Sequence, residues 1–148
     1  MVALSGGDKL EAYLADLGSK LEKSAVLDVG FFENATYPDG TPVAMVAAVQ
    51  NFGAPSRGIP PRPFFTRMID DHKDEWGPQL GERLMARDMD PQAALADMGI
   101  ILEGELQQAI IDLTDPPLKP ATIKRKGFEK PLVASGHMLN SVASKVTT

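Results

Sequence analysis

The chain contains no cysteine, one tryptophan and two histidines among its 148 residues. Without cysteine it can form no disulfide bond, no thiolate metal site and no thiol nucleophile. It also lacks the ~18 consecutive apolar residues that a membrane-spanning helix requires, and Met1 to Asp8 show neither the basic nor the apolar region of a secretion signal. We therefore expect a soluble protein without a membrane partner, and its length fits one domain, residues 1–148.

Motifs for catalysis are equally scarce. Asp71, His72 and Glu75 lie in one charged stretch and offer oxygen and nitrogen ligands to a divalent ion, which leaves a small metal-assisted hydrolase as an alternative function. Most such stretches are solvated helix faces. His137 precedes Ser141, but neither a nucleophile elbow nor an orienting carboxylate accompanies the pair, so a structural or surface histidine is favoured. We expect no enzyme, no catalytic residue, no metal, no cofactor and no small-molecule substrate.

The net charge of −5 is distributed unevenly along the chain. Residues 64–115 carry 4 basic and 12 acidic side chains, whereas residues 116–148 carry 6 basic and 1 acidic. The basic end suits an acidic face of a neighbouring subunit or the phosphate backbone of DNA, and it leaves a DNA-binding module as a second alternative function. A solvated loop is the plain structural interpretation. The basic candidates are Lys119, Lys124, Arg125, Lys126 and Lys130.

Two helices are expected in the first half of the chain. The first runs from about residue 8 to 23, because one apolar stripe recurs there with the period of an α-helix. The second is short and buried, covers residues 43–52, and has Thr41 as its cap, Pro42 in its first position and Gly53 as its stop. The stripe of the first helix consists of Leu10, Tyr13, Leu14, Leu17 and Leu21.

Two longer helices are expected in the acidic middle of the chain. One starts at Phe64, and Gly77-Pro78 is expected to break or kink it before a second half resumes. The other opens at Asp90-Pro91 and runs to about residue 113. Its small residues favour close packing against a sheet, and they are Ala94, Gly99 and Gly104.

Strand patterns are short and few. Residues 25–32 and 141–146 each predict one strand, and a helical turn is expected ahead of the second strand. Residues 34–42 are dense in turn formers, with Asp39-Gly40 as the reversal. The predicted fold class is therefore α+β, with a small antiparallel sheet packed against two to four helices and a proline-rich arm.

The proline-rich arm, residues 59–65, is the most informative segment of the chain. It follows Gln50-Asn51-Phe52-Gly53, where the glycine offers a chain reversal, and its three prolines fix φ while removing backbone donors. We expect a stiff arm that is seated by Phe64 and Phe65 and leaves Arg62 as the residue most free to contact a partner. The candidate assembly residues are Phe52, Ile59, Pro60, Arg62, Pro63, Phe64 and Phe65.

Short motifs follow one another in a fixed order over residues 26–146. They begin with Val29-Gly30, continue through residues 38–53 and the arm, and close with proline-leucine pairs, a glycine turn and a last strand. This ordered combination resembles the tail-completion and neck family of long-tailed bacteriophages and prophages, whose members are also called minor tail or virion morphogenesis proteins. The closing motifs are Pro117-Leu118, Thr122-Ile123, Lys126-Gly127, Pro131-Leu132, Gly136, Met138-Leu139 and Ser141-Val142.

The resemblance implies a structural protein of the virion. Family members are small α+β subunits that act at the head-tail neck, in tail completion or head-tail joining, and assemble as rings. It implies as partners further copies of the chain, in a six-fold or twelve-fold ring, and adjacent neck and tail proteins, with non-specific contact to packaged DNA. The implied location is the virion, after assembly in the cytoplasm of the bacterial host.

Overall fold

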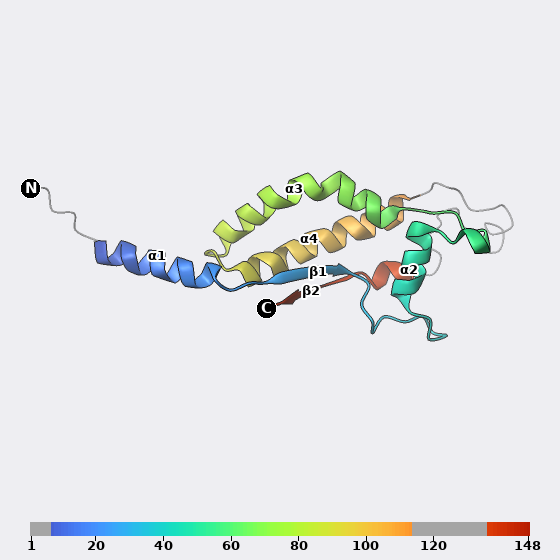
Figure 1. The fold of residues 1–148 in the computed structure, drawn as a ribbon, viewed down its shortest axis with the longest axis horizontal. Coiled ribbons are helices and arrows are strands. Elements are labelled where there is room, and N and C mark those ends of the chain that lie inside the picture. Colours follow the sequence, from blue (N-terminus) through green and yellow to red (C-terminus); the bar gives the residue numbers. More distant parts are fainter. Residues whose placement is uncertain (1–6, 114–135) are drawn as a thin grey trace, which may run out of the picture.

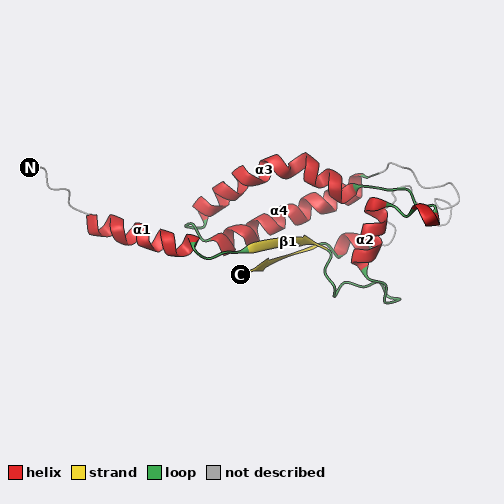
Figure 2. Cartoon of the chain, in the orientation of Figure 1, coloured by secondary structure: helices red, strands yellow, loops and turns green. Residues whose placement is uncertain are grey.

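Two long antiparallel helices and a two-stranded sheet form the body of the molecule, and one further helix projects from it (Figure 1). The computed structural model describes residues 7–113 and 136–148. Within these residues the fold is a small α+β arrangement, so the predicted fold class is confirmed (Figure 2).

Helices α3 (Phe64–Ala86) and α4 (Pro91–Asp112) are joined by a tight turn. In that turn Asp88 and Met89 both have positive φ, at 52° and 57°. The side chain of Asp90 accepts hydrogen bonds from the backbone N–H groups of Gln92 and Ala93, so it caps α4 as the Asp-Pro pair predicts. The local sequence therefore determines where this helix starts.

Helix α3 continues through Pro78 without interruption, so of the two outcomes expected at Gly77-Pro78 the break is wrong, while the curved course of α3 in Figure 1 agrees with the kink. Proline supplies no N–H to the carbonyl one turn earlier, and the helix bends instead of ending. Figure 1 shows α3 arching over α4. Packing along α4 holds the two halves of α3 in one helix, and this packing is not visible in the local sequence.

The sheet consists of β1 (Val26–Gly30) and β2 (Ala143–Thr147), which pair antiparallel from Val26 opposite Thr147 to Gly30 opposite Ala143. Both strands pack on α4. Gly99 makes this possible, since a Cβ there would lie 2.5 Å from Oγ of Ser144. Close packing is thus confirmed at Gly99, but it is wrong for Gly104, where a Cβ would meet nothing within 4 Å.

Helix α2 (Val43–Phe52) begins one residue later than the capping prediction implies. Pro42 occupies the cap position, with φ −63° and ψ 130°, and the backbone of Thr41 is instead bound to the carboxylate of Asp39. The helix stops at Gly53 as predicted, with a positive φ of 76°. Only one side of the helix is buried, and its buried residues are Val43, Ala47 and Asn51.

His137 holds the loop of residues 36–42 against the short helix α6 (His137–Asn140). Its Nε2 donates to the carbonyl of Thr36 at 2.7 Å, and its ring stacks on Tyr37 with centroids 4.9 Å apart. The hydroxyl of Ser141 donates to the backbone carbonyl of His137, not to the ring. The interpretation of His137 as a structural residue is therefore confirmed.

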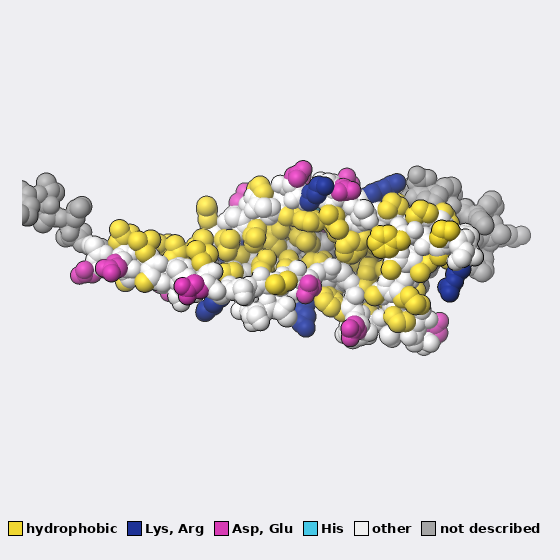
Figure 3. All heavy atoms as spheres, in the orientation of Figure 1, with side chains coloured by type: hydrophobic (Ala, Val, Ile, Leu, Met, Phe, Trp, Pro, Cys, Tyr) yellow, Lys and Arg dark blue, Asp and Glu magenta, His cyan; other side chains and the backbone are white. Residues whose placement is uncertain are grey.

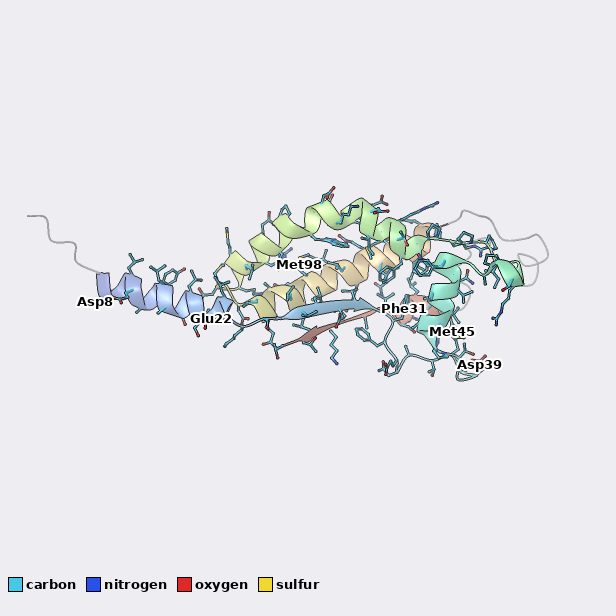
Figure 4. All side chains as sticks on the ribbon, in the orientation of Figure 1. Asp8, Glu22, Phe31, Asp39, Met45 and Met98 are labelled. Carbon is cyan, nitrogen blue, oxygen red and sulfur yellow. The ribbon has the colours of Figure 1, made fainter. Side chains whose placement is uncertain are left out.

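The core lies where α2, α3 and α4 meet, at the end of the body away from the projecting helix (Figure 1). Phe31, at the end of β1, makes an edge-to-face contact with Phe64 at a centroid distance of 6.4 Å. Figure 4 labels Phe31 and also Met98, a buried residue of α4. The largest fully buried side chains are Val43, Phe64, Leu106 and Ile110.

Helix α1 (Gly7–Leu21) projects from the opposite end of the body, and it has no buried residue. Figure 4 labels Asp8 in its first turn and Glu22 just after its last residue. The predicted helix over residues 8–23 is confirmed. Among the described residues, none of the helices combines the length and the apolar character needed to cross a membrane.

Candidate assembly surfaces

Asn51 joins α2 to the start of α3. It is buried on α2, and its side-chain oxygen accepts hydrogen bonds from the backbone N–H groups of Phe65 and Thr66, at 3.0 and 3.3 Å. Its amide nitrogen donates to the hydroxyl of Thr66 at 3.0 Å. Because Pro63 provides no side-chain cap for α3, Asn51 of the preceding helix satisfies the first free donors of α3 in its place.

Gly53 allows the chain to return close to α2. At its φ of 76° a Cβ would lie 2.8 Å from the nitrogen of Pro61 and 2.9 Å from the carbonyl oxygen of Ile59. The intervening residues form a closed loop, because Ala54 and Ile59 exchange two backbone hydrogen bonds around the short helix η1 (Pro55–Arg57). The arm is thus held against the body and does not stand free of it.

Arg62 is buried, with 7% of its surface exposed, so the expectation that it is the residue most free to contact a partner is wrong. Its backbone N–H donates to the carbonyl of Gln50 at 2.7 Å, and its Nη1 donates to Oε1 of the same residue at 3.2 Å. Burial lowers the pKa of the Arg62 guanidinium from its usual value. Arg62 therefore ties the arm to α2, and the exposed arginine of this loop is Arg57.

The remaining candidate residues divide into a buried and an exposed group. Phe64 lies in the core with 1% of its surface exposed, while Ile59, Pro63 and Phe65 are half-buried. Phe52, by contrast, is 75% exposed, and Pro60 and Pro61 are also exposed. The seating of the arm by its two terminal aromatics agrees with expectation, whereas the surface that the arm region offers to a partner centres on Phe52.

A shallow apolar recess of about 330 Å³ lies beside Phe52, between α2 and the start of α3. Phe31 and Phe65 contribute aromatic rings to its wall, and Ile69 closes it along α3. Such a recess next to an exposed aromatic side chain suits the insertion of an apolar group from a partner. We call Phe52 and this recess the arm surface.

The apolar stripe of α1 forms a second uncovered surface. The exposed fractions of Leu10, Tyr13, Leu14 and Leu21 lie between 51% and 59%. Figure 3 shows hydrophobic side chains along α1 and continuing over the adjoining face of the body. An apolar surface of this extent on one helix is typical of an interface.

His72 lies between two carboxylates on the side of α3 that faces α4. Its Nδ1 is 3.6 Å from a carboxylate oxygen of Glu75 and 3.6 Å from one of Glu105. The second oxygen of Glu105 accepts a hydrogen bond from Nε1 of Trp76 at 2.8 Å. The sequence therefore pointed to His72 and Glu75 but not to Glu105, and Asp71 is not part of the group.

The basic candidates Lys119, Lys124, Arg125, Lys126 and Lys130 lie outside the described residues. Asn51 is the main residue that sequence reasoning missed, although a signal for it exists. It is the polar member of an otherwise apolar set at i, i+4 and i+8 on α2, after Val43 and Ala47. A polar residue on a buried helix face needs a partner, and here that partner is the next helix.

Comparison with known proteins adds no relative, since no protein-family model, no curated protein and no solved structure matches the chain significantly.

Proposed function

We propose that this chain is a structural subunit of the neck of a long-tailed bacteriophage or prophage. It acts in tail completion or head-tail joining, assembles as a ring with copies of itself, and contacts adjacent neck or tail proteins in the virion. The observation that carries the proposal is the ordered set of motifs between residues 26 and 146.

The geometry of these motifs supports the proposal. Val29 and Gly30 pair in the sheet with Ser144 and Ala143, next to the closing motifs of the chain. Gly53 packs against the arm. Within the described residues, motifs that are distant in sequence thus contact one another, which gives their joint occurrence a physical reason. The closing motifs from Pro117-Leu118 to Pro131-Leu132 lie outside the described residues.

Exposed apolar surfaces at both ends of the molecule also support an assembly role. Phe52 is uncovered at the arm end, and the stripe of α1 is uncovered at the other end. Two different surfaces at opposite ends suit head-to-tail association, which closes into a ring when the rotation between subunits allows it.

The direct test is removal of the gene from the phage or prophage that encodes the chain. We expect separate filled heads and finished tails by electron microscopy, and joined particles once the gene is supplied again. Particles that join normally without the gene would exclude a neck function.

A point substitution tests the arm surface within the same assay. Phe52→Asp should leave the purified protein folded, as measured by circular dichroism and thermal melting, because the side chain is exposed, but it should reduce particle joining strongly. Met85→Asp is the matched control, since Met85 is 80% exposed on α3 and does not line the recess at the arm surface. Equal effects of the two substitutions would remove the arm surface from the proposal.

A divalent-cation site is the second candidate, and one observation favours it: ligand atoms of His72, Glu75 and Glu105 all lie within 4.8 Å of one another. Calorimetric titration with zinc or manganese checks it, with Glu105→Gln as the variant that removes one ligand. Binding heat in the unmodified protein that disappears in Glu105→Gln would support a metal site and reopen the hydrolase alternative. Absence of heat at millimolar metal would exclude both.

A further inference from the structure

His72 on α3 has a buried ring nitrogen, Nδ1, that has no hydrogen-bond partner among the described residues. This atom lies 3.6 Å from a carboxylate oxygen of Glu75 and 3.6 Å from one of Glu105. Both separations are too long for a hydrogen bond, because a charge-assisted N–H donor approaches a carboxylate oxygen to about 2.7–2.9 Å. The three groups therefore converge on one place without bonding one another.

The two equal distances fit ligands that surround a common ion. Zinc binds imidazole nitrogen and carboxylate oxygen at about 2.0–2.2 Å in a tetrahedron, so two of its ligand atoms lie ~3.4 Å apart. The 3.6 Å separations at His72 are close to this value, and ligand atoms of all three residues lie within 4.8 Å of one another. A proton on Nδ1 would instead bond one carboxylate at short range, whereas the observed distances are equal.

The three residues come from two helices that pack together. His72 and Glu75 are three residues apart on α3, a spacing that places both on one face of the helix. Glu105 comes from α4, which packs along α3. Metal sites in helical proteins are built from side chains on facing helices in this way. An ion held by these ligands would join α3 to α4.

Trp76 holds the carboxylate of Glu105 in place. Its Nε1 donates to one oxygen of Glu105 at 2.8 Å, and the other oxygen is the one near His72. The side chain of Glu105 is only 13% exposed, so this hydrogen bond orients a largely buried carboxylate. Hydrogen bonds of this kind orient metal ligands and raise the affinity of a site. Trp76 is also the single tryptophan of the chain, so its fluorescence reports on Glu105.

The surroundings of the three residues favour a cation and leave it a route from solvent. Among the described residues, an adjoining cavity of about 230 Å³ is lined by three carboxylates and one arginine, an excess of negative charge that raises the local cation concentration. The side chains of His72 and Glu75 are 37% and 62% exposed, so an ion reaches them from outside. The charged lining residues are Arg67, Asp71, Glu105 and Asp112.

We propose that His72, Glu75 and Glu105 bind one Zn²⁺ ion that links α3 to α4, and that Trp76 is a positioning residue for Glu105. The nitrogen ligand favours zinc over Mg²⁺ and Ca²⁺, which prefer oxygen ligands, and zinc binds such mixed sites more tightly than Mn²⁺. The inference rests on the divalent-cation site named above as the second candidate. It gives that site its ion and a structural role, and it is independent of the neck function.

The first experiment titrates the metal-free full chain with zinc chloride and follows tryptophan fluorescence and binding heat. Glu75→Gln and Glu105→Gln should each weaken zinc binding roughly tenfold or more. The exposed side chain of Glu75 makes the first of these variants safe for folding. Asp71→Asn is the matched control, because it removes the same charge beside the same cavity but no ligand. No binding at millimolar zinc, binding of Mg²⁺ as tight as that of zinc, or equal weakening by Asp71→Asn would overturn the proposal.

The second experiment tests the positioning role of Trp76 by calorimetry. Trp76→Phe keeps an aromatic ring but loses the N–H donor, and it should weaken zinc binding roughly tenfold. If Trp76 acts through Glu105, the same substitution should have little further effect in a chain that already carries Glu105→Gln. Equal weakening in both backgrounds would mean a general effect on the fold and would remove the positioning role.

The third experiment tests the link between the helices by thermal melting. An ion that binds only the folded pair of helices stabilises it, so zinc should raise the melting temperature of the unmodified chain and of Asp71→Asn, but not that of Glu105→Gln. A melting temperature that zinc leaves unchanged would contradict the link.

Failure of this inference can be told apart from failure of the neck function. If particles require the gene but the chain binds no zinc, the zinc site is wrong and the neck function stands. If zinc binds as expected but particles join without the gene, the neck function is wrong and the zinc site stands.

Discussion

Leu106 of α4 and Leu14 of α1 are the same residue type within similar helical patterns, yet Leu106 is 0% exposed and Leu14 is 55% exposed. The body buries the apolar face of α4 against α3 and the sheet, whereas within residues 7–113 and 136–148 nothing covers the stripe of α1. The comparison teaches that helical periodicity predicts a face to be buried but does not say which molecule will bury it.

The largest expected effect compares these two leucines directly. Leu106→Ala should lower the free energy of unfolding by about 2–5 kcal/mol, because it leaves a cavity in the core. Leu14→Ala should change it by no more than about 0.5 kcal/mol in dilute solution, where α1 has no partner. Urea unfolding at low protein concentration measures both values. A large loss for Leu14→Ala under these conditions would mean that α1 is covered within its own chain.

Two glycines differ in the space that surrounds them: the arm packs tightly against Gly53, whereas Gly104 faces open space. Gly53→Ala should cost about 1–3 kcal/mol, because the backbone conformation there is nearly exclusive to glycine and the arm leaves no room for a Cβ. Gly104→Ala in α4 meets open space, so it should stabilise the protein by about 0.5–1 kcal/mol through helix propensity. Thermal melting of the two variants gives the sign of each effect, and a neutral Gly53→Ala would contradict the close approach of the arm.

Asn51 provides the next prediction, since it stabilises the body through a contact between helices. Asn51→Ala removes the cap of α3 and should cost about 0.5–2 kcal/mol. Asn34→Ala, in the exposed loop after β1, is the matched control and should be nearly neutral. Hydrogen exchange should also show faster exchange at Phe65 and Thr66 in the Asn51 variant. Unchanged exchange there would argue against the cap.

The smallest effect concerns the turn beside which α1 meets the body. Arg87 donates two hydrogen bonds to the carboxylate of Asp97, at 2.7 and 2.8 Å, and these bonds lower the pKa of Asp97 from its usual 3.8. Because the folded pKa lies below the unfolded one, the stabilisation is complete above about pH 4 and is lost as the pH falls through the folded value. Asp97→Asn should therefore flatten the dependence of stability on pH in this acidic range, and high salt should reduce the difference. An unchanged acid profile would mean that the pair contributes nothing.

Local signals predicted most of the secondary structure. Asp90-Pro91 and Gly53 act through their own backbone geometry, so their helix boundaries could be read directly from the sequence. Pro78 could not, because its tolerance depends on packing between α3 and α4. Arg62 was assigned wrongly for a similar reason: its partner Gln50 lies on α2, outside the arm, and a charged residue among prolines carries no local sign of burial.

The candidate sites show the same division. The sequence identified the arm as a candidate assembly segment, but it did not tell which side chains of the arm would be exposed. The stripe of α1 predicted a helix and gave no sign that its face would stay exposed. Phe52 and Phe64 are both aromatic and close in sequence, yet one is on the surface and the other in the core. That difference follows from the side of α2 on which residue 52 falls and from the position of residue 64 at the start of α3.

The direct passage from α1 into β1 has a mechanical consequence. Figure 1 shows the projecting helix and the strand following one another along the long axis of the molecule. Hydrogen bonds between β1 and β2 run across the strands, so a pulling force along α1 would load the whole ladder from Val26 to Gly30 in shear. All rungs would then share the tension at once and would not open one after another. A subunit that is held through α1 would gain a tension-resistant link from a sheet of only two strands.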